Sequence, residues 1–495
     1  MRKIFLAVFV SITSCLVLQA QMVHHLTLDE SIEIAKEQSL SMQRLQQNLK
    51  IAEFNLKIAK NRLKTNVNLS FTLPNYTETI REYEDSTGFS YYAVKQLDYS
   101  TQLRITQPLP TDGNVYVTTN LRGLNDYNTD IRSTNFSTRV GFEQPLDAFY
   151  GYNSIRTRLK EAELNYEQTS KSLKREELNL IYSVSSSYYN LLSSQRTIDI
   201  SKSNMERQNE AYEISKNKYE AGLIREVDAL QMEVDLAQAQ NDYDIAVYSQ
   251  TSSANAFKEL IGLNLADSIA LNNEMKYDPI IVDPLKAVQY AKENRLEIRE
   301  QEIQIELQKL AIKSQKAQGM IKSSINGYFE KAGVSRTDVG DSFFGSSIDK
   351  SFSNFRDRPM NYGIGLTISI PILDWGVNRS QVRVQEARLK QNMISKEEIE
   401  RGIETEVLNL AARINSNLKQ LQLLERSATV AEKSFEITLK RYSDGDIDSQ
   451  SLALERDRLN RAYSTHLSAY ISYQLSLADL MRKTFYDFKN DRVIE

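Results

Sequence analysis

A seven-residue repeat of apolar side chains runs through the middle of the chain and again near its end. The segment 152–221 contains no glycine or proline, and its repeat is Val184, Leu191, Ile198, Met205, Tyr212 and Tyr219. The ladder returns 223 positions later as Val407, Ile414, Leu421, Ala428, Phe435 and Tyr442. A sustained heptad keeps one seam of a helix against a partner, so both stretches are predicted to be long α-helices packed as left-handed coiled coils.

Both ladders end in the motif Tyr-x-x-Gly, at Tyr219 and Gly222 and again at Tyr442 and Gly445. A glycine in this place adopts the left-handed backbone conformation that ends a helix. Two copies of one pattern at a fixed offset indicate an internally duplicated protein.

A shorter helical stretch precedes the β-like part of each half. In residues 26–64, Thr27 stands three positions before Glu30, which is the spacing of a capping box. Residues 283–322 are the counterpart, and the sequence Ala-Lys-Glu recurs in both stretches. The duplication therefore covers nearly the whole chain after its first residues.

The N-terminus predicts a secretory signal peptide over residues 1–20, because a basic start precedes a short apolar stretch and a small-residue cleavage site. A retained membrane anchor fits less well, since the apolar run is short and interrupted by Ser and Thr. Cys15 is the only cysteine. Cleavage after Ala20 leaves a mature chain without disulfides, and the alternative is a lipoprotein lipidated at Cys15.

The charge balance argues against a nucleic-acid partner. Removal of Arg2 and Lys3 from the 61 basic residues leaves the chain more acidic, against 65 acidic residues, whereas nucleic-acid binding needs a basic face. No later stretch approaches the ~18 uninterrupted apolar residues of a membrane helix. A membrane crossing by this chain would therefore need strands.

Two-residue periodicity appears at the same place in each half. The runs 66–73, 99–106 and 136–143 alternate apolar and polar residues, as does 363–370 in the second half. Strands with one apolar and one polar face fit a soluble sheet or a lipid-facing barrel with a wet lumen. Tyr and Phe gather in or beside these runs, which fits aromatic girdles at a bilayer but also an ordinary sheet core.

The fold class predicted is mostly α-helical with a β part, in an internally duplicated chain. Its parts are a signal peptide (1–20), first-half short helices (21–65), a first-half β segment (66–146), first-half long helices (147–262), a connector (263–284), second-half short helices (285–322), a second-half β segment (323–371), second-half long helices (372–485) and a C-terminal tail (486–495).

The expected helix from Asn153 to Tyr219 would be about 100 Å long at ~1.5 Å per residue. A compact domain cannot bury such a helix, so the long helices must form a rod or a wall. One chain supplies few strands, and an open sheet edge is not tolerated in lipid. A spanning barrel would therefore have to be closed by several copies, which predicts a symmetric oligomer with helices below a barrel.

The junctions between strands and long helices carry a family resemblance. Gln144-Pro145-Leu146-Asp147 and Pro371-Ile372-Leu373-Asp374-Trp375-Gly376, with the paired Tyr-x-x-Gly turns and the two-half plan, resemble the TolC-type outer-membrane efflux proteins over residues 26–485. The resemblance implies a homotrimer in the outer membrane of a Gram-negative bacterium. Each chain would give four strands to a twelve-stranded barrel, and the helices would form a periplasmic tunnel.

The same resemblance implies function. The family's channels conduct substrates passively from the periplasm, in tripartite efflux or type I secretion systems. Their tunnel ends dock a periplasmic adaptor (membrane fusion) protein and an inner-membrane transporter. For this chain the docking tips would be 219–228 and 442–451, including Tyr219, Gly222, Leu223, Tyr442 and Gly445.

The resemblance also implies a periplasmic gate at these tips. Tyr442 matches a family tyrosine and Asp228 a family aspartate in the links that keep the tip closed. Arg225 lies in the first tip, whereas the family's gating arginine falls on Ile447 in the second. The family's constricting aspartates fall on Ser451 and Leu454, which are not acidic.

Three neighbouring acids are candidates for a replacement acidic ring, which would favour cations: Asp444, Asp446 and Asp448. An equally open interpretation is that they only solvate an exposed turn.

The first β segment departs from the family. Residues 66–146 hold an extra pair of strand-like runs, including 115–121, and Gln107-Pro108-Leu109 repeats the later Gln144-Pro145-Leu146. An enlarged extracellular hairpin is expected here, and a long loop is expected over 331–361.

An enzymatic function finds no support in the sequence. The histidines are His24, His25 and His466, without zinc spacing, and no phosphate-binding loop or nucleophile elbow is present. No cofactor is expected, and His24 and His25 are interpreted as a solvated pair. The rival function is a secreted periplasmic coiled-coil scaffold without a pore, against which the alternating strands in both halves count.

Overall fold

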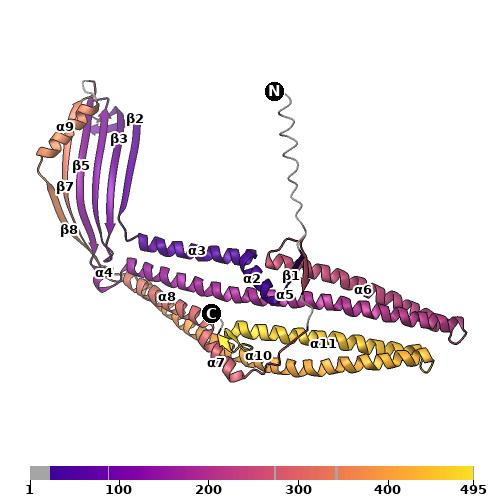
Figure 1. Ribbon diagram of the computed structural model, residues 1–495. Helices are drawn as coiled ribbons and strands as arrows, with labels where there is room; N and C mark the ends of the chain where they lie inside the picture. Colours follow the sequence, from indigo (N-terminus) through magenta and orange to yellow (C-terminus); the bar gives the residue numbers. More distant parts are fainter. Residues whose placement is uncertain (1–22, 87, 272–274, 341–343, 494–495) are drawn as a thin grey trace, which may run out of the picture. The chain divides into compact units, whose positions relative to one another are not determined.

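The computed structural model of the chain describes residues 23–86, 88–271, 275–340 and 344–493 (Figure 1). The predicted signal peptide and Cys15 lie outside these residues. The described residues form two compact units. The helical unit comprises the described parts of 1–48, 170–300 and 396–495, and the sheet unit comprises 49–169 and 301–395.

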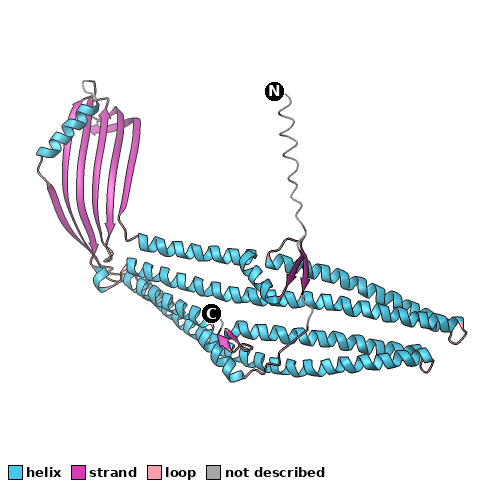
Figure 2. Ribbon diagram, viewed as in Figure 1, coloured by secondary structure: helices cyan, strands magenta, loops and turns pink. Residues whose placement is uncertain are grey.

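Helices and strands alternate along the chain as the two-half plan predicts (Figure 2). The helices are α2 (Leu28–Gln38), α3 (Leu40–Asn61), α4 (Asp147–Tyr150), α5 (Ser154–Glu220), α6 (Glu226–Ile261), α7 (Pro284–Asn294), α8 (Leu296–Gln318), α9 (Phe344–Asp357), α10 (Val377–Asp444) and α11 (Ser449–Thr484). The strands are β1 (Val23–Leu26), β2 (Asn66–Asp85), β3 (Gly88–Pro108), β4 (Asn114–Asp126), β5 (Ile131–Pro145), β6 (Ser268–Leu271), β7 (Lys322–Asp338), β8 (Asn361–Ser369), β9 (Tyr486–Asp487) and β10 (Arg492–Val493).

The two short helices that open the halves begin with side-chain caps. The predicted capping box is present, since the Thr27 amide donates to the Glu30 carboxylate at 2.8 Å and the Glu30 amide donates to the Thr27 hydroxyl at 3.3 Å. At α7, the carboxylate of Asp283 accepts from the Leu285 amide at 2.9 Å, and Pro284 is the first helical residue. Both devices satisfy amides that lack a partner inside the helix.

The heptad seam of α10 is closed along its length. Val407, Ile414 and Leu421 are fully buried, and Ala428, Phe435 and Tyr442 are at most 5% exposed. The matching seam of α5 is buried at Val184 and Leu191, whereas Tyr219 at its end is 42% exposed. The duplicated pattern therefore packs fully in the second half and only partly in the first.

The core of the helical unit draws on both halves of the chain. Phe257 of α6, Ala287 of α7, Val407 of α10 and Tyr473 of α11 belong to one buried cluster. The Tyr473 hydroxyl donates to the Asp278 carbonyl at 2.7 Å and accepts from the Ile280 amide at 2.9 Å. These bonds hold the predicted connector against α11.

A short parallel pair of strands joins the first described residues to the connector. β1 pairs with β6, with Val23 opposite Ser268 and Leu26 opposite Leu271. His25 is exposed in β1.

Six strands form one antiparallel sheet in the order β2-β3-β4-β5-β7-β8. The resemblance implies four barrel strands per chain, whereas the sheet of this chain contains six, four of them from residues 66–146. The enlarged extracellular hairpin expected in these residues stays a prediction. β3 pairs with β4 over the whole of β4, from Gln96 opposite Asp126 to Pro108 opposite Asn114. The run 115–121 alternates like its neighbours and is an ordinary member of the sheet.

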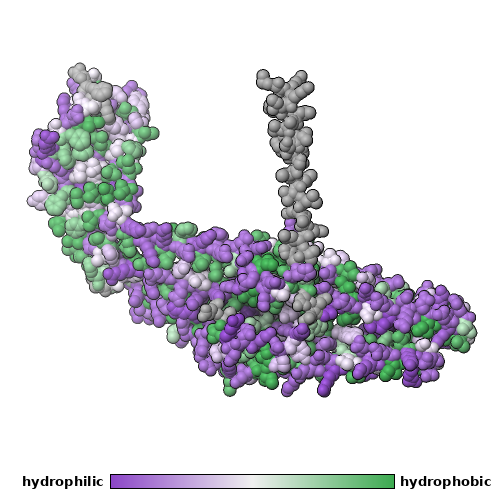
Figure 3. Space-filling view, in the orientation of Figure 1, coloured by the Kyte–Doolittle hydropathy of each residue, from purple (hydrophilic) through white to green (hydrophobic). Residues whose placement is uncertain are grey.

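The sheet keeps one apolar and one polar face across all six strands. One row of directly paired residues is Val67, Ile105, Val117, Val140, Phe329 and Tyr362. The adjacent row is Asn68, Arg104, Thr118, Arg139, Glu330 and Asn361. Figure 3 shows many apolar residues on the sheet, whereas the helices are mainly hydrophilic.

Aromatic side chains lie over glycines at four consecutive strand pairs. The directly opposed pairs are Tyr99–Gly123, Tyr116–Gly141, Phe142–Gly327 and Tyr328–Gly363. A Cβ atom on Gly123 would come within 1.9 Å of the Tyr99 ring, and one on Gly141 within 2.6 Å of the Tyr116 ring. The missing side chain makes room for the ring, and each pair fixes the register of two strands.

Helix α9 takes the place of the long loop expected over 331–361, where β7 also continues to Asp338. The helix packs on β5 and β7 (Figure 1), on the face that carries Phe136, whose ring contacts Phe352 and Phe355. Its Ser351 hydroxyl donates to the Gly333 carbonyl at 2.9 Å, and its Ser347 hydroxyl bonds the Thr134 hydroxyl at 2.8 Å. Small residues on both sides allow the close approach.

Among the described residues, no helix has both the length and the apolar composition that crossing a membrane requires.

Gly123→Val is expected to destabilise the sheet by about 1–3 kcal/mol, the usual range for overpacking a close contact. The added side chain must displace the Tyr99 ring, which lies 1.9 Å from the position of a Cβ. Thermal loss of the β-sheet circular dichroism signal measures the change. Gly340→Val is the control, because nothing lies within 4 Å of a Cβ there. Equal melting temperatures for both variants would contradict the role given to the aromatic–glycine pairs.

Candidate gate at the helix tips

Each long helix pair turns through a glycine, as the Tyr-x-x-Gly motifs predict. Gly222 has φ 73° and Gly445 has φ 86°. In the first turn the Leu223 amide donates to the Lys218 carbonyl at 2.9 Å, and in the second the Asp446 amide donates to the Arg441 carbonyl at 2.9 Å. These are Schellman turns, which need a left-handed residue and so favour glycine.

The helices that follow the turns begin with charged residues. Asp448 caps α11, and its carboxylate accepts from the Ser451 amide at 2.9 Å. Arg225 precedes α6 and makes a two-pronged contact with Asp228, with both N···O distances 3.1 Å. This guanidinium lowers the pKa of the Asp228 carboxyl. The Arg225 side chain is 82% exposed, so the pair is a surface contact within one turn.

Tyr442 links the two tips through a residue that the sequence analysis missed. Its side chain is 2% exposed. The Lys218 ammonium lies 4.4 Å from the centre of the Tyr442 ring and donates to the Tyr442 carbonyl oxygen. Lys218 belongs to the last turn of α5 and Tyr442 to that of α10. A cation above a buried ring that also bonds a helix-end carbonyl is a favourable contact.

A local sequence signal for this contact exists. A basic residue precedes the tyrosine in both Tyr-x-x-Gly motifs, as Lys218 before Tyr219 and Arg441 before Tyr442. The motif itself gives no hint that Lys218 crosses to the other tip, since that depends on how the two turns meet.

The three acids predicted for an acidic ring lie on the surface of the second turn. Asp444 ends α10, and Asp444, Asp446 and Asp448 are all exposed. The Arg225 guanidinium lowers the pKa of Asp228, and the charge of Asp448 offsets that shift only in small part. The acid in the first turn of α6 and the N-cap of α11 therefore repel each other weakly. Of the predicted docking residues, Leu223 is 74% exposed and Tyr219 42%.

A second link between the halves lies further along the helices. Arg456 of α11 is 16% exposed in its side chain, and its guanidinium contacts the Asp235 carboxylate of α6 at 3.2 Å. The same group donates to the side-chain oxygen of Gln208 on α5, which is 2% exposed. One turn on, the Asn460 amide donates to Asn204 at 2.7 Å. Three helices are thus joined by partly buried polar bonds.

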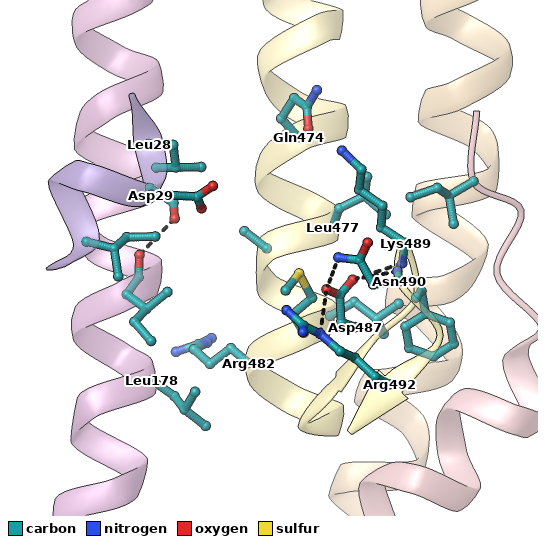
Figure 4. Close-up of a pocket in the computed structure, with 18 of the residues that line it drawn as sticks. Leu28, Asp29, Leu178, Gln474, Leu477, Arg482, Asp487, Lys489, Asn490 and Arg492 are labelled. Atoms are coloured by element: carbon teal, nitrogen blue, oxygen red, sulfur yellow. Dashed lines mark hydrogen bonds and ion pairs between the residues drawn. The ribbon is translucent and has the colours of Figure 1, made fainter. Parts of the chain in front are cut away.

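A cavity of about 870 Å³ lies elsewhere in the helical unit (Figure 4). Apolar side chains from α2, α5 and α11 line one part of it, including Leu28, Leu178 and Leu477. At its rim, Asp487 accepts from the Asn490 side chain at 2.6 Å and from the Lys489 amide at 2.9 Å. The Asp487 carboxylate therefore serves to hold the turn of the C-terminal hairpin.

Among the residues that the structure describes, no group of three or more His, Cys, Asp or Glu side chains could hold a metal ion.

Comparison with known families identifies one match. The profile of the family described as "Outer membrane efflux protein" matches residues 32–263 and 287–484. No curated protein matches the chain in sequence.

Solved structures share the fold at low sequence identity. A solved structure of CusC has a TM-score of 0.66 and 14% identity, covering 95% of both chains. The Campylobacter jejuni CmeC outer membrane channel has a TM-score of 0.67 and 15% identity, covering 95% of this chain and 90% of its own. The open state of the Neisseria gonorrhoeae MtrE channel has a TM-score of 0.63 and 16% identity, covering 94% and 90%.

Lys218→Met is expected to loosen the two tips. The substitution removes the ammonium from Tyr442 but keeps most of the apolar stem, so about 1–2 kcal/mol of local stability is lost. Hydrogen exchange of amides near Gly222 and Gly445 should become roughly tenfold faster or more. Lys216→Met is the matched control, because that side chain is exposed on the same helix. Unchanged protection at Gly445 would contradict the link.

The contribution of Asp228 to stability is expected to depend on pH. Because Arg225 lowers the pKa of the folded-state carboxyl, the contribution is complete above the unfolded value of about 3.9 and is lost as the pH falls through the lower folded-state value. The difference in melting temperature between the wild type and Asp228→Asn should stay constant from about pH 7 to pH 5 and shrink only in stronger acid. Glu220→Gln, at an exposed position, controls for net charge. A difference that fades at neutral pH would refute this.

Proposed function

Since the chain belongs to the outer membrane efflux protein family, we propose that it is the outer-membrane channel of a tripartite efflux or type I secretion system. In this role it conducts substrates passively from the periplasm and an inner-membrane transporter to the exterior. The observation that carries the proposal is a six-stranded sheet with one apolar and one polar face, built into a chain of very long duplicated helices. Members of this family are transport proteins and not enzymes.

The channel is a homotrimer in the outer membrane of a Gram-negative bacterium and extends into the periplasm. Two features support an oligomer. The sheet of one chain has two exposed edges, and the end of the α5 ladder is only partly covered, with Tyr219 42% exposed. In a membrane, strand edges must be paired.

The tips of the helices form the periplasmic gate and the docking site for the adaptor protein. The gate comprises Arg225, Asp228, Tyr442, Asp444, Asp446 and Asp448, together with Lys218, whose ammonium lies over the Tyr442 ring. In the closed state Lys218 holds the α5 tip to the α10 tip, and Arg456 holds α11 to α5 and α6. Opening requires that these contacts break.

The adaptor binds the surface formed by Tyr219, Gly222, Leu223 and Gly445 around the buried Tyr442. Leu223 is the most exposed apolar side chain of this set, at 74%. Docking there would pull directly on the turns that the gate contacts hold. No nucleotide-binding motif is present in the sequence, so the energy comes from the partner transporter.

The division of the chain follows this function. Residues 66–146 and 323–371 form the membrane part, 147–262 and 372–485 the long tunnel helices, and the short helices with the connector the equatorial part. The alternative, a periplasmic scaffold without a pore, is not favoured. It gives no reason for a row such as Val67, Ile105 and Val117 to stay apolar across a sheet whose edges are exposed.

Conductance of the purified protein in planar bilayers tests the proposal. The wild type should show small, closed-state currents, and Arg225→Gln, Asp228→Asn and Tyr442→Ala should each raise the conductance at least several-fold. Lys216→Met should match the wild type. Unchanged conductance in all three variants would remove the gate assignment, and failure of every variant to form a pore would remove the channel.

A further inference from the structure

Both edges of the six-stranded sheet expose alternating apolar side chains. On β2 these include Val67, Leu69 and Phe71, at 61%, 56% and 65% exposure. On β8 they include Leu366 and Ile368, at 60% and 56%. A long edge strand with an apolar stripe and unpaired backbone groups is a template for pairing with another strand. In lipid such an edge is not tolerated.

The two edge strands are suited to antiparallel pairing, because their apolar and polar residues belong to the same two faces of the sheet and the strands run in opposite directions. The apolar row begins at Val67 on β2 and ends at Tyr362 on β8, and the polar row beside it begins at Asn68 and ends at Asn361. Because the order is antiparallel throughout, β2 and β8 run in opposite directions. A β2 strand laid antiparallel beside β8 of another copy therefore continues both faces.

The β2–β3 hairpin is a full part of the sheet and not an appendage. β3 covers the entire edge of β4, so β4 has no free edge to offer to another copy. Both hairpins end in the same local structure. The Gln107 side chain donates to the Pro108 carbonyl at 2.8 Å, and the Gln144 side chain donates to the Pro145 carbonyl at 2.8 Å.

A threonine hydroxyl just before the first strand of each hairpin, β2 or β4, bonds the same glutamine. Thr65 donates to the Gln107 side-chain oxygen, and Thr111 donates to that of Gln144 at 2.6 Å. The turn between the hairpins is also tied to the long helix, because Asp112 accepts from the Ser154 amide at 3.0 Å and from its hydroxyl at 2.8 Å. The extra hairpin is thus built in at the start of α5.

We infer that β2 of one copy pairs with β8 of the next, so that three copies close an eighteen-stranded barrel instead of a twelve-stranded one. The inference rests on the proposed trimeric channel, and each copy contributes the six strands that its sheet contains. Six strands are fewer than the smallest membrane barrels hold, about eight, so one copy cannot close alone.

The consequence for the channel is a wider exit. Barrel diameter grows roughly linearly with strand number, and about 16–18 strands leave an open aqueous channel. The polar row that would face this lumen includes Arg104, Arg139 and Glu330, of which Arg139 and Glu330 form an ion pair at 2.9 Å. Size selection then falls on the helix tips and not on the barrel.

Cysteine cross-linking tests the seam in the full-length protein with Cys15→Ser. One cysteine replaces Asn68, Ser70 or Thr72 on the polar face of β2, and a second replaces Asn361, Thr367 or Ser369 on that of β8. All nine combinations are made, because the register between copies is open. At least one should give a covalently linked ladder up to the trimer after mild oxidation, since directly opposed strand residues meet disulfide geometry.

The matched control moves the first cysteine to β4, at Thr118, Asn120 or Arg122. These positions should not link to the same β8 cysteines, because both edges of β4 are paired. Cross-links from β4 with none from β2 would overturn the inference in favour of a twelve-stranded barrel. Native mass spectrometry separates a failure of the β2–β8 pairing from a failure of the proposed trimeric channel. A trimer without the β2 link overturns only the inference, whereas a monomer in detergent overturns the proposed channel as well.

Discussion

The sheet depends on one constraint, which is that the register of each strand pair determines which side chains lie on each face. Side chains alternate with a period of two, so a slip of one residue at any strand pair would move apolar residues onto the polar face. The row from Val67 to Tyr362 stays apolar through five strand pairs. Aromatic rings seated over Gly123, Gly141, Gly327 and Gly363 act against such a slip, because a shifted ring would meet a Cβ.

The features that the sequence predicted well are those decided by local chemistry. The length of α5, the left-handed Gly222 and Gly445, and the capping box at Thr27 each depend on residues within a few positions of one another. A heptad seam or a helix stop carries its cause in its own segment. Family membership followed from the order of such local signals along both halves.

The features that the sequence missed depend on contacts between distant segments. The run 115–121 had a clear strand pattern, but only its pairing with β3 and β5 assigns it to the sheet. α9 can pack closely only because Gly333 on the distant strand β7 has no Cβ, which would collide with the Ser351 carbonyl oxygen. Lys218 became part of the candidate gate because α5 and α10 end beside each other. No periodicity within either segment carries that information.

The sheet and the helix tips of the proposed channel differ in what it takes to open them. The sheet is held by backbone hydrogen bonds along whole strands, and separating any pair would expose an unpaired edge that lipid cannot solvate. The tips are held by a few side-chain contacts, such as Lys218 with Tyr442 and Arg456 with Asp235, each worth about 1–3 kcal/mol. Contacts of that size are within reach of a docking protein, whose binding supplies a comparable difference in free energy. A channel built in this way has a fixed exit and an adjustable entrance.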